Sequence, residues 1–187
     1  MEPLWSVAEA LWFFLPAMLP NTSAAIFGGG KPIDGGRMYH GKRLLGEGKT
    51  WRGLFVGISS GIAMGYLESI ISIPLGRNLS SVYVPSLAIL PVLIALSAGS
   101  MCGDLAGALW KRRRGMKRGE KAPILDQYDF TAGAFLLAIA VAPSYTFRYL
   151  IDGYAIYGFI CVLLVIYPLH RLINYIGYRT GLKSVPW

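Results

Sequence analysis

The stretch GDLAGALWKRRRGMKRGEKAPILDQYDF, residues 103–130, joins two apolar segments of the chain. Asp104 lies near the end of the first segment, and Asp126 and Asp129 open the second. Carboxylates are ligands that Mg²⁺ prefers and cationic side chains bind phosphate, so the stretch contains groups suited to chemistry on a nucleoside triphosphate. A basic loop between two hydrophobic helices is also typical of the cytoplasmic side of a membrane protein. The basic cluster between the acids consists of Lys111, Arg112, Arg113, Arg114, Lys117, Arg118 and Lys121.

The composition places the chain in a membrane. Of the 187 residues, 54% are hydrophobic and 15% are charged, whereas a soluble domain carries about 25% charged residues. Five apolar segments approach the ~20 residues that cross a bilayer as a helix. We therefore predict an all-α, polytopic integral membrane protein with about five transmembrane helices and two basic cytoplasmic loops, formed by residues 1–187 as a single domain. The five segments are 4–27, 54–75, 85–110, 131–150 and 154–176.

The distribution of Lys and Arg predicts the orientation in the membrane. Six of these residues fall in segment 28–53, seven in 111–130 and three after residue 170. Only Arg77 and Arg148 fall on the opposite side. We expect a multi-pass protein of the cell membrane, with its N-terminus outside and its basic loops and C-terminus in the cytoplasm. The net charge of +8 favours anionic lipids or phosphates as partners, and no module for binding nucleic acid is present.

The first basic loop contains phosphate-binding groups without the fold that usually carries them. Gly48-Lys49-Thr50 resembles the end of a P-loop, but Arg43 stands where that motif requires a glycine and no β-strand precedes the block. A Walker fold is therefore excluded. Lys49 and Arg52 can still neutralise phosphate oxygens, and Thr50 can donate to them. Thr50 is also a suitable N-cap for the next helix.

The first apolar segment ends in polar residues and glycines. Pro20 precedes three polar residues at a depth where such side chains usually face other protein or a wet cavity. Two alternatives remain open, a contact between helices and the wall of a polar pocket. The glycines that follow allow the chain to turn sharply and to approach a neighbour closely. The polar residues are Asn21, Thr22 and Ser23, and the glycines are Gly28, Gly29 and Gly30.

Two apolar segments carry glycines at four-residue spacing, which favours close helix packing. These glycines are Gly57, Gly61 and Gly65 in one segment and Gly99, Gly103 and Gly107 in the other.

The three acids of the opening stretch are expected to lie together. Asp104 lies ~9 Å inside the end of its helix, where an ionised carboxylate needs a salt-bridge partner such as Lys111 or a bound cation. Asp126 and Asp129 share one helix face if a helix begins near Leu125. Each of these two acids alone could simply favour a helix start. Together with Asp104, they indicate a divalent ion held beside phosphate oxygens.

Motifs in both halves of the chain resemble one enzyme family, the CDP-diacylglycerol synthases, which are membrane cytidylyltransferases of phospholipid synthesis. Ala108 stands where the bacterial members have a serine, and residues 121–125 replace their Gly-His-Gly-Gly stretch. The N-terminal motifs and the small size are similar to the archaeal branch, and the likeness spans the whole chain. The matching residues are Gly103-Asp104-Leu105, Lys111-Arg112, Asp126 to Phe130, Pro20-Asn21, Phe27 to Gly30, Pro32, Asp34 and Leu45 to Gly53.

The resemblance implies a reaction between CTP and unsaturated archaetidic acid, 2,3-di-O-geranylgeranylglyceryl phosphate, a prenylated glycerol ether lipid phosphate. The products would be CDP-archaeol and pyrophosphate, with one or two Mg²⁺ ions required. Asp104, Asp126 and Asp129 are then the expected metal ligands and, with Lys49 and Arg112, the catalytic residues. Lys49, Lys111, Arg112 and Lys121 are expected on phosphate oxygens. Thr22, Ser23, Gly28, Gly29, Gly30, Thr50 and Arg52 are the remaining candidates for contact with the nucleotide.

Two other functions fit the sequence less well. A CDP-alcohol phosphotransferase requires D-G-x-x-A-R followed by G-x-x-x-D-x-x-x-D, whereas residues 34–37 read Asp-Gly-Gly-Arg and the later acids are spaced D-x-x-D. A transporter of lipids or anions would place charged residues near the bilayer midplane on broken helices. Here they cluster at the cytoplasmic interface.

Overall fold

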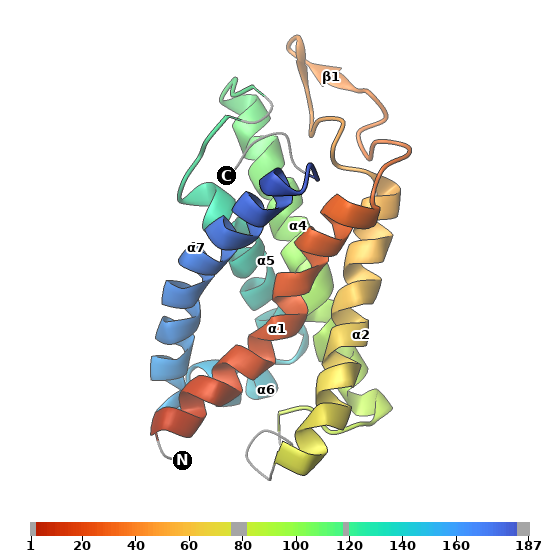
Figure 1. The fold of residues 1–187 in the computed structure, drawn as a ribbon. Coiled ribbons are helices and arrows are strands. Elements are labelled where there is room, and N and C mark those ends of the chain that lie inside the picture. Colours follow the sequence, from red (N-terminus) through yellow and green to blue (C-terminus); the bar gives the residue numbers. More distant parts are fainter. Residues whose placement is uncertain (1–2, 76–81, 118–119, 183–187) are drawn as a thin grey trace.

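The computed structural model of the chain describes residues 3–75, 82–117 and 120–182 and forms a bundle of long helices (Figure 1). Apart from a short hairpin, the described residues contain only helices and loops, which confirms the prediction of an all-α protein. The long helices are α1 (Pro3–Phe27), α2 (Trp51–Leu75), α4 (Leu90–Arg113), α5 (Leu125–Val141) and α7 (Ala155–Arg179). The shorter elements are β1 (Met38–Tyr39), β2 (Lys42–Arg43), the 3₁₀ turn η1 (Leu87–Ile89) and α6 (Pro143–Leu150).

Four segments within the described residues are long and apolar enough to cross a bilayer: Leu4–Phe27, Trp51–Pro74, Leu87–Arg113 and Ala155–Arg179. They correspond to four of the five predicted spans. Their outward faces are apolar, as lipid requires, with residues such as Ile70 and Leu164 more than half exposed. The polytopic membrane architecture is therefore confirmed.

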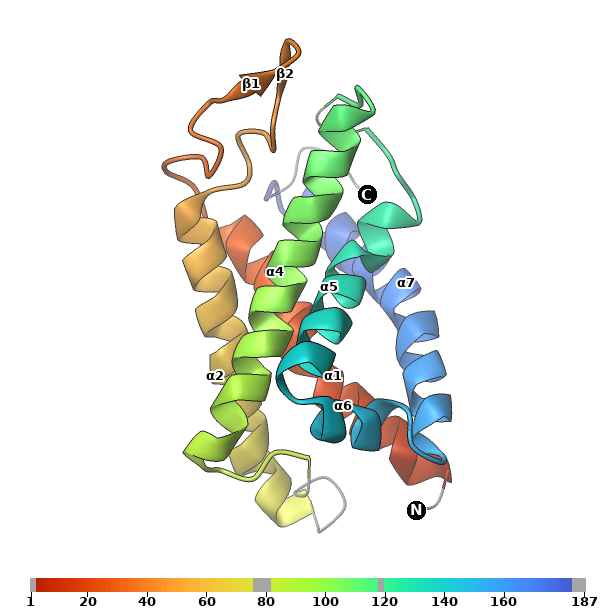
Figure 2. The same cartoon turned by 180° about the vertical axis from the view of Figure 1, so that it is seen from behind.

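The fifth predicted span, 131–150, is wrong as a single helix. It consists of the second part of α5 and all of α6, which lies across the end of the bundle (Figure 2). The break falls at Ala142 because a residue that precedes a proline avoids the helical conformation, and Ala142 has φ −139° and ψ 64°. α5 has 17 residues, which extend over about 25 Å, near the lower limit for crossing a bilayer.

The predicted basic segments gather at one end of the bundle. The loop between α1 and α2, the loop between α4 and α5 and the end of α7 lie together there, whereas the start of α1 lies at the opposite end (Figure 1). Arg148, in α6, is also at the opposite end. Arg77, Arg118 and Lys183 lie outside the described residues.

Glycine ridges bring the helices into close contact, as their spacing predicts. A Cβ atom on Gly103 of α4 would overlap the carbonyl oxygen of Asp129 in α5, and one on Gly99 would lie 2.5 Å from the carbonyl oxygen of Gly133. On α2, a Cβ on Gly61 would lie 2.5 Å from the carbonyl oxygen of Pro16 in α1. The backbone of α5 therefore rests directly on α4.

We expect Gly103→Ala to destabilise the protein, because the added methyl group must push α5 away from α4. Overpacking of this kind costs about 1–3 kcal/mol, so the midpoint of thermal unfolding in detergent should fall. Gly48→Ala is the matched control, since a Cβ there meets no atom within 4 Å. Equal melting temperatures for the two variants would contradict this account of the α4–α5 contact.

Candidate active site

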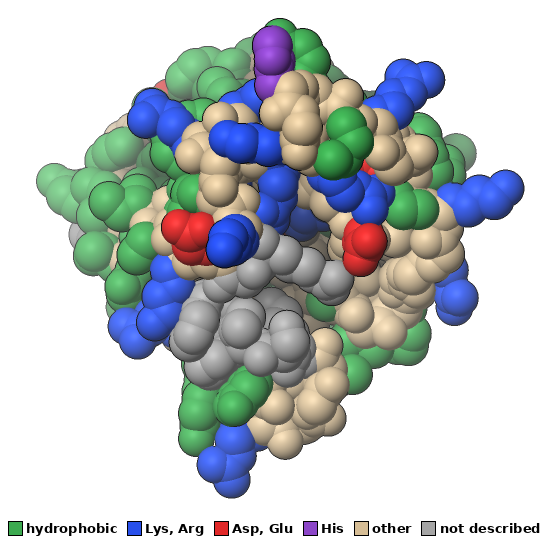
Figure 3. Space-filling model, turned by 90° about the horizontal axis from the view of Figure 1, so that it is seen from above, with side chains coloured by type: hydrophobic (Ala, Val, Ile, Leu, Met, Phe, Trp, Pro, Cys, Tyr) green, Lys and Arg blue, Asp and Glu red, His purple; other side chains and the backbone are tan. Residues whose placement is uncertain are grey.

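A cavity of about 310 Å³ opens at the end of the bundle that carries the basic loops. Its volume lies in the range of small-molecule sites. Seen from this end, Lys and Arg side chains surround a hollow (Figure 3). Every long helix contributes to its wall. The lining residues are Asn21, Ala24, Ala25, Ile33, Gly48, Lys49, Thr50, Gly53, Leu54, Met101, Asp104, Leu105, Lys111, Arg112, Glu120, Asp126, Asp129, Phe130, His170 and Asn174.

A second, more open hollow of about 450 Å³ lies between the first loop and the end of α4. It shares Gly48, Lys49, Lys111 and Arg112 with the cavity, so the two spaces adjoin.

The first basic loop is closed at its base, and this closure positions Lys49. The N–H of Ile33 donates to the carbonyl of Lys49 (2.8 Å), and the N–H of Trp51 donates to that of Lys31 (3.2 Å). The hydroxyl of buried Thr50 accepts from the N–H groups of Gly29 (3.2 Å) and Gly53 (3.1 Å). Thr50 is therefore the cap of α2, as predicted. The backbone next to Lys49 is fixed, while its side chain reaches into the cavity.

Gly29 and Gly30 make the predicted turn that leads out of α1. Their φ angles are +95° and +82°, values that only glycine adopts readily. The turn returns the chain over the end of the bundle instead of away from it.

Asp34 holds the rest of this loop together. Its carboxylate pairs with Arg43 at 2.7 Å and accepts from the N–H groups of Gly36, Leu45 and Gly46. The hydrogen bond from Arg43, followed by those from the backbone, keeps the pKa of Asp34 well below its ordinary value. This residue organises the loop from a position outside the cavity lining.

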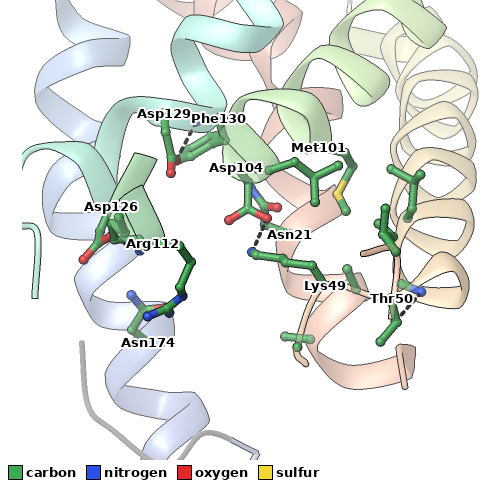
Figure 4. A pocket seen from close by; sticks show the side chains of 18 of the residues that line it. Asn21, Lys49, Thr50, Met101, Asp104, Arg112, Asp126, Asp129, Phe130 and Asn174 are labelled. Atoms are coloured by element: carbon green, nitrogen blue, oxygen red, sulfur yellow. Dashed lines mark hydrogen bonds and ion pairs between the residues drawn. The ribbon is translucent and has the colours of Figure 1, made fainter. Parts of the chain in front are cut away.

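The three predicted acids all line the cavity, from α4 and α5. Asp104 and Asp129 lie beside each other across the contact between these helices (Figure 4). The side chain of Asp129 packs against Gly107, where any Cβ atom would displace it. α5 begins at Leu125, as predicted, so Asp126 and Asp129 share the face that meets α4.

Each of two acids is paired with a lysine. Lys49 forms an ion pair with Asp104, which is 55 residues away along the chain. Lys111 pairs with Asp126 at 2.5 Å, and the N–H of Ala122 donates to the other oxygen of the same carboxylate (2.9 Å). The alternative pairing of Lys111 with Asp104 is therefore wrong. α4 continues to Arg113, three residues beyond the predicted end, and so carries Lys111 to the start of α5.

Whether these acids share a metal ion stays a prediction. Among the described residues, no three His, Cys, Asp or Glu side chains are close enough together to hold one ion as they stand. The donor set nevertheless fits Mg²⁺, because carboxylate oxygens are its preferred protein ligands. Two of the three carboxylates already hold a cationic group, the ammonium of a lysine.

Of the remaining predicted residues, some line the cavity and others do not. Arg112 lines the cavity and donates to the carbonyl of Met116. Thr22 borders a separate small hollow beside the cavity, and Ser23 is buried. None of the following lines the cavity in the described part of the chain, and their contact with a nucleotide stays a prediction: Thr22, Ser23, Gly28, Gly29, Gly30, Arg52 and Lys121.

Two residues of α7 that sequence reasoning missed also line the cavity. His170 contacts Gln127 of α5 through its Nδ1 atom (2.7 Å), and Asn174 is buried one turn further on. Both lie in an apolar segment that carries no motif. The one signal available was the presence of polar side chains within a predicted span, which usually face protein or a cavity.

Comparison with known proteins yields one family. The family model described as CarS-like CDP-archaeol synthase matches residues 4–187. The CDP-archaeol synthase of Methanosphaerula palustris is 44% identical, over 92% of this chain and 99% of the relative. That of Methanosarcina barkeri is 42% identical over the same shares, and that of Halobacterium salinarum is 38% identical over the whole of both chains.

A solved structure is also similar. It is described as an intramembrane enzyme for the biosynthesis of archaeal membrane lipids. The TM-score is 0.60 at 34% sequence identity, and the match covers 85% of this chain and 93% of that one.

We expect Asp34→Asn to loosen the first loop, because the charged partner of Arg43 is lost. Hydrogen bonds to charged groups contribute about 1.5–3 kcal/mol, so trypsin should cleave within residues 31–49 at least about tenfold faster. Glu47→Gln is the matched control, since it removes the exposed partner of the same arginine. Unchanged cleavage of Asp34→Asn would show that the loop is held by other contacts.

The same loop should stay ordered throughout the neutral pH range. A carboxylate with a lowered pKa in the folded state stabilises it fully above the unfolded pKa of about 4 and loses this effect only as the pH falls further.

Proposed function

Because the chain belongs to the CDP-archaeol synthase family of CTP-dependent cytidylyltransferases, we propose that it transfers CMP from CTP to unsaturated archaetidic acid. The products are CDP-archaeol and pyrophosphate, and the reaction requires Mg²⁺. One observation carries this proposal: four carboxylates and three cationic side chains from distant parts of the chain line a single cavity at the basic end of the bundle.

The reaction joins two anions and needs little proton transfer. An oxygen of the lipid phosphate attacks the α-phosphorus of CTP. The bond from that phosphorus to the bridging oxygen breaks, and pyrophosphate leaves with the electron pair. The lipid phosphate is already ionised, so it needs no general base. The main contribution of the protein is to hold the two phosphates together and to offset their charge.

Lys49, Lys111 and Arg112 are the cations placed for this task. They enter the cavity from the first loop and from the last turn of α4. Thr50 and Gly53 add the N-terminal end of α2, where the helix dipole favours an anion. This arrangement supports binding of the triphosphate between the first loop and α4.

Asp104, Asp126 and Asp129 would hold Mg²⁺. When bound, the ion withdraws negative charge from the phosphates and stabilises the pyrophosphate that leaves. The contact of half-buried Asp129 with Gly107 keeps its carboxylate turned toward Asp104.

A lipid would reach the cavity from the side of the bundle. The small hollow between α1 and α7 is lined mainly by apolar residues, and Asn21, Phe130 and His170 belong both to it and to the cavity. Prenyl chains lying in the bilayer could therefore extend along this face while the phosphate occupies the cavity. The preference for ether-linked chains rests on the family.

We expect the basic end of the bundle to face the cytoplasm, with the N-terminus outside. Trypsin added to inverted membrane vesicles should then cleave the first loop, whereas right-side-out vesicles should protect it until detergent is added. Protection in inverted vesicles would reverse the proposed orientation.

The reaction itself is tested with purified protein, labelled CTP, Mg²⁺ and a panel of ether and ester lipid phosphates. Mg²⁺-dependent pyrophosphate release with the ether lipid is expected. Asp104→Asn should lower the rate at least about 100-fold, as loss of transition-state charge stabilisation does. Asp152→Asn, the same change in the turn between α6 and α7 at the opposite end of the bundle, should have no effect. Absence of turnover in the wild type would overturn the proposed function, and near-normal turnover of Asp104→Asn would remove that residue from the site.

A further inference from the structure

The two lysines of the cavity are bound to the same carboxylates that are proposed to hold the metal. Lys49 contacts Asp104, and Lys111 contacts Asp126. All four side chains are between 20% and 28% exposed, so these pairs are largely shielded from water. Arg112 differs, because it donates to a backbone carbonyl and not to an acid. Without ligands, then, both lysines neutralise protein charges.

The charges of the cavity are nearly balanced in this state. Four carboxylates and three cations line it: Asp104, Asp126, Asp129 and Glu120, and Lys49, Lys111 and Arg112. A nucleoside triphosphate entering alone would bring several negative charges into a space with no surplus of positive charge. A divalent cation entering alone would have to displace both lysines, which would then remain as unpaired ammonium groups beside it.

Binding both ligands together removes both difficulties. The metal takes the carboxylates, and each released ammonium group finds a phosphate oxygen within the same cavity. The two lysines and their two carboxylates keep a charged partner throughout, whereas binding of either ligand alone leaves some of these four groups without one.

We propose that Lys49 and Lys111 exchange partners, from the carboxylates to the triphosphate, and that this exchange makes the binding of CTP and of the divalent cation mutually dependent. The inference rests on the proposed function and adds to it a coupling between the two ligands. In thermodynamic terms, each ligand raises the affinity for the other by the same factor.

The surrounding structure allows the exchange with side-chain motion alone. The backbone at Lys49 is held by the hydrogen bond from Ile33 and by the cap at Thr50, while the four-carbon stem of lysine is flexible. Asp126 keeps its hydrogen bond from Ala122 when Lys111 leaves. The Asp126 carboxylate therefore stays in place while the ammonium group of Lys111 moves.

The test measures binding without turnover. Mn²⁺ replaces Mg²⁺ as a spectroscopic probe, and its binding is measured by electron paramagnetic resonance. The binding of CTP is measured by calorimetry. Each ligand is titrated with and without the other, and lipid phosphate is left out of all samples. In Lys49→Met, Mn²⁺ alone should bind about tenfold more tightly, because no ammonium group competes for Asp104. CTP should bind more weakly, and the factor by which each ligand improves the other should fall.

The opposite changes in the two affinities, tighter for Mn²⁺ and weaker for CTP, distinguish the exchange from a purely structural role of the lysine. Loss of a structural ion pair would weaken both ligands or neither, and weaker or unchanged Mn²⁺ binding in a folded Lys49→Met would overturn the exchange. Lys31→Met removes an exposed cation of the same loop that lies outside the cavity lining, and it should leave both affinities unchanged.

Lys111→Met tests the second pair and serves also if Lys49→Met does not fold. It should show the same opposite signs. If the wild type turns over CTP but the coupling persists in both methionine variants, the exchange is wrong and the proposed function stands. If the wild type binds neither ligand, the proposed function fails as well.

Discussion

The contact between α4 and α5 is the constraint on which the rest of the site depends. Within a bilayer the hydrophobic effect does not drive helices together, so contacts between them depend on close packing at small residues. Gly99 and Gly103 leave space on α4 that the backbone of α5 occupies, and Gly107 leaves space for the side chain of Asp129. Asp129 of α5 lies beside Asp104 because the two helices come so near.

The same contact explains how acids can lie at this depth. A carboxylate buried among helices is costly unless it has a charged or hydrogen-bonding partner. α4 supplies Lys111 to α5 across the contact, and the first loop supplies Lys49 to α4. The first loop is ordered by the hydrogen bonds of Asp34 and by the cap at Thr50. These two residues, which are not among the three acids, therefore determine the position of Lys49.

Patterns within a few residues of sequence predicted most of the fold. Pairings between residues far apart in the sequence could not be predicted from such patterns. The glycine spacing, the start of α5 at Leu125 and the cap at Thr50 each follow from residues a few positions apart. The pairing of Lys49 with Asp104 joins residues 55 positions apart, and no local signal specifies it. The break at Ala142 was visible in principle, because Pro143 restricts the residue before it, but a count of apolar residues passes over one proline. His170 and Asn174 lie in an apolar segment where only their polarity sets them apart.

A site for highly charged ligands must also be stable when those ligands are absent. Leaving its acids and cations unpaired would destabilise the folded state, because each buried charge would lack a partner. Pairing them internally solves this problem, but only if the pairs can be given up when ligands arrive. Partly exposed lysines on flexible stems meet both conditions, since their exchange from carboxylate to phosphate replaces one oxygen anion by another. The arginine, whose planar fork is harder to redirect, is bonded to a neutral carbonyl and has no such pair to break. Lysine thus suits the two positions where the cation must release a carboxylate, and arginine suits the neighbouring position, where no ion pair has to be broken.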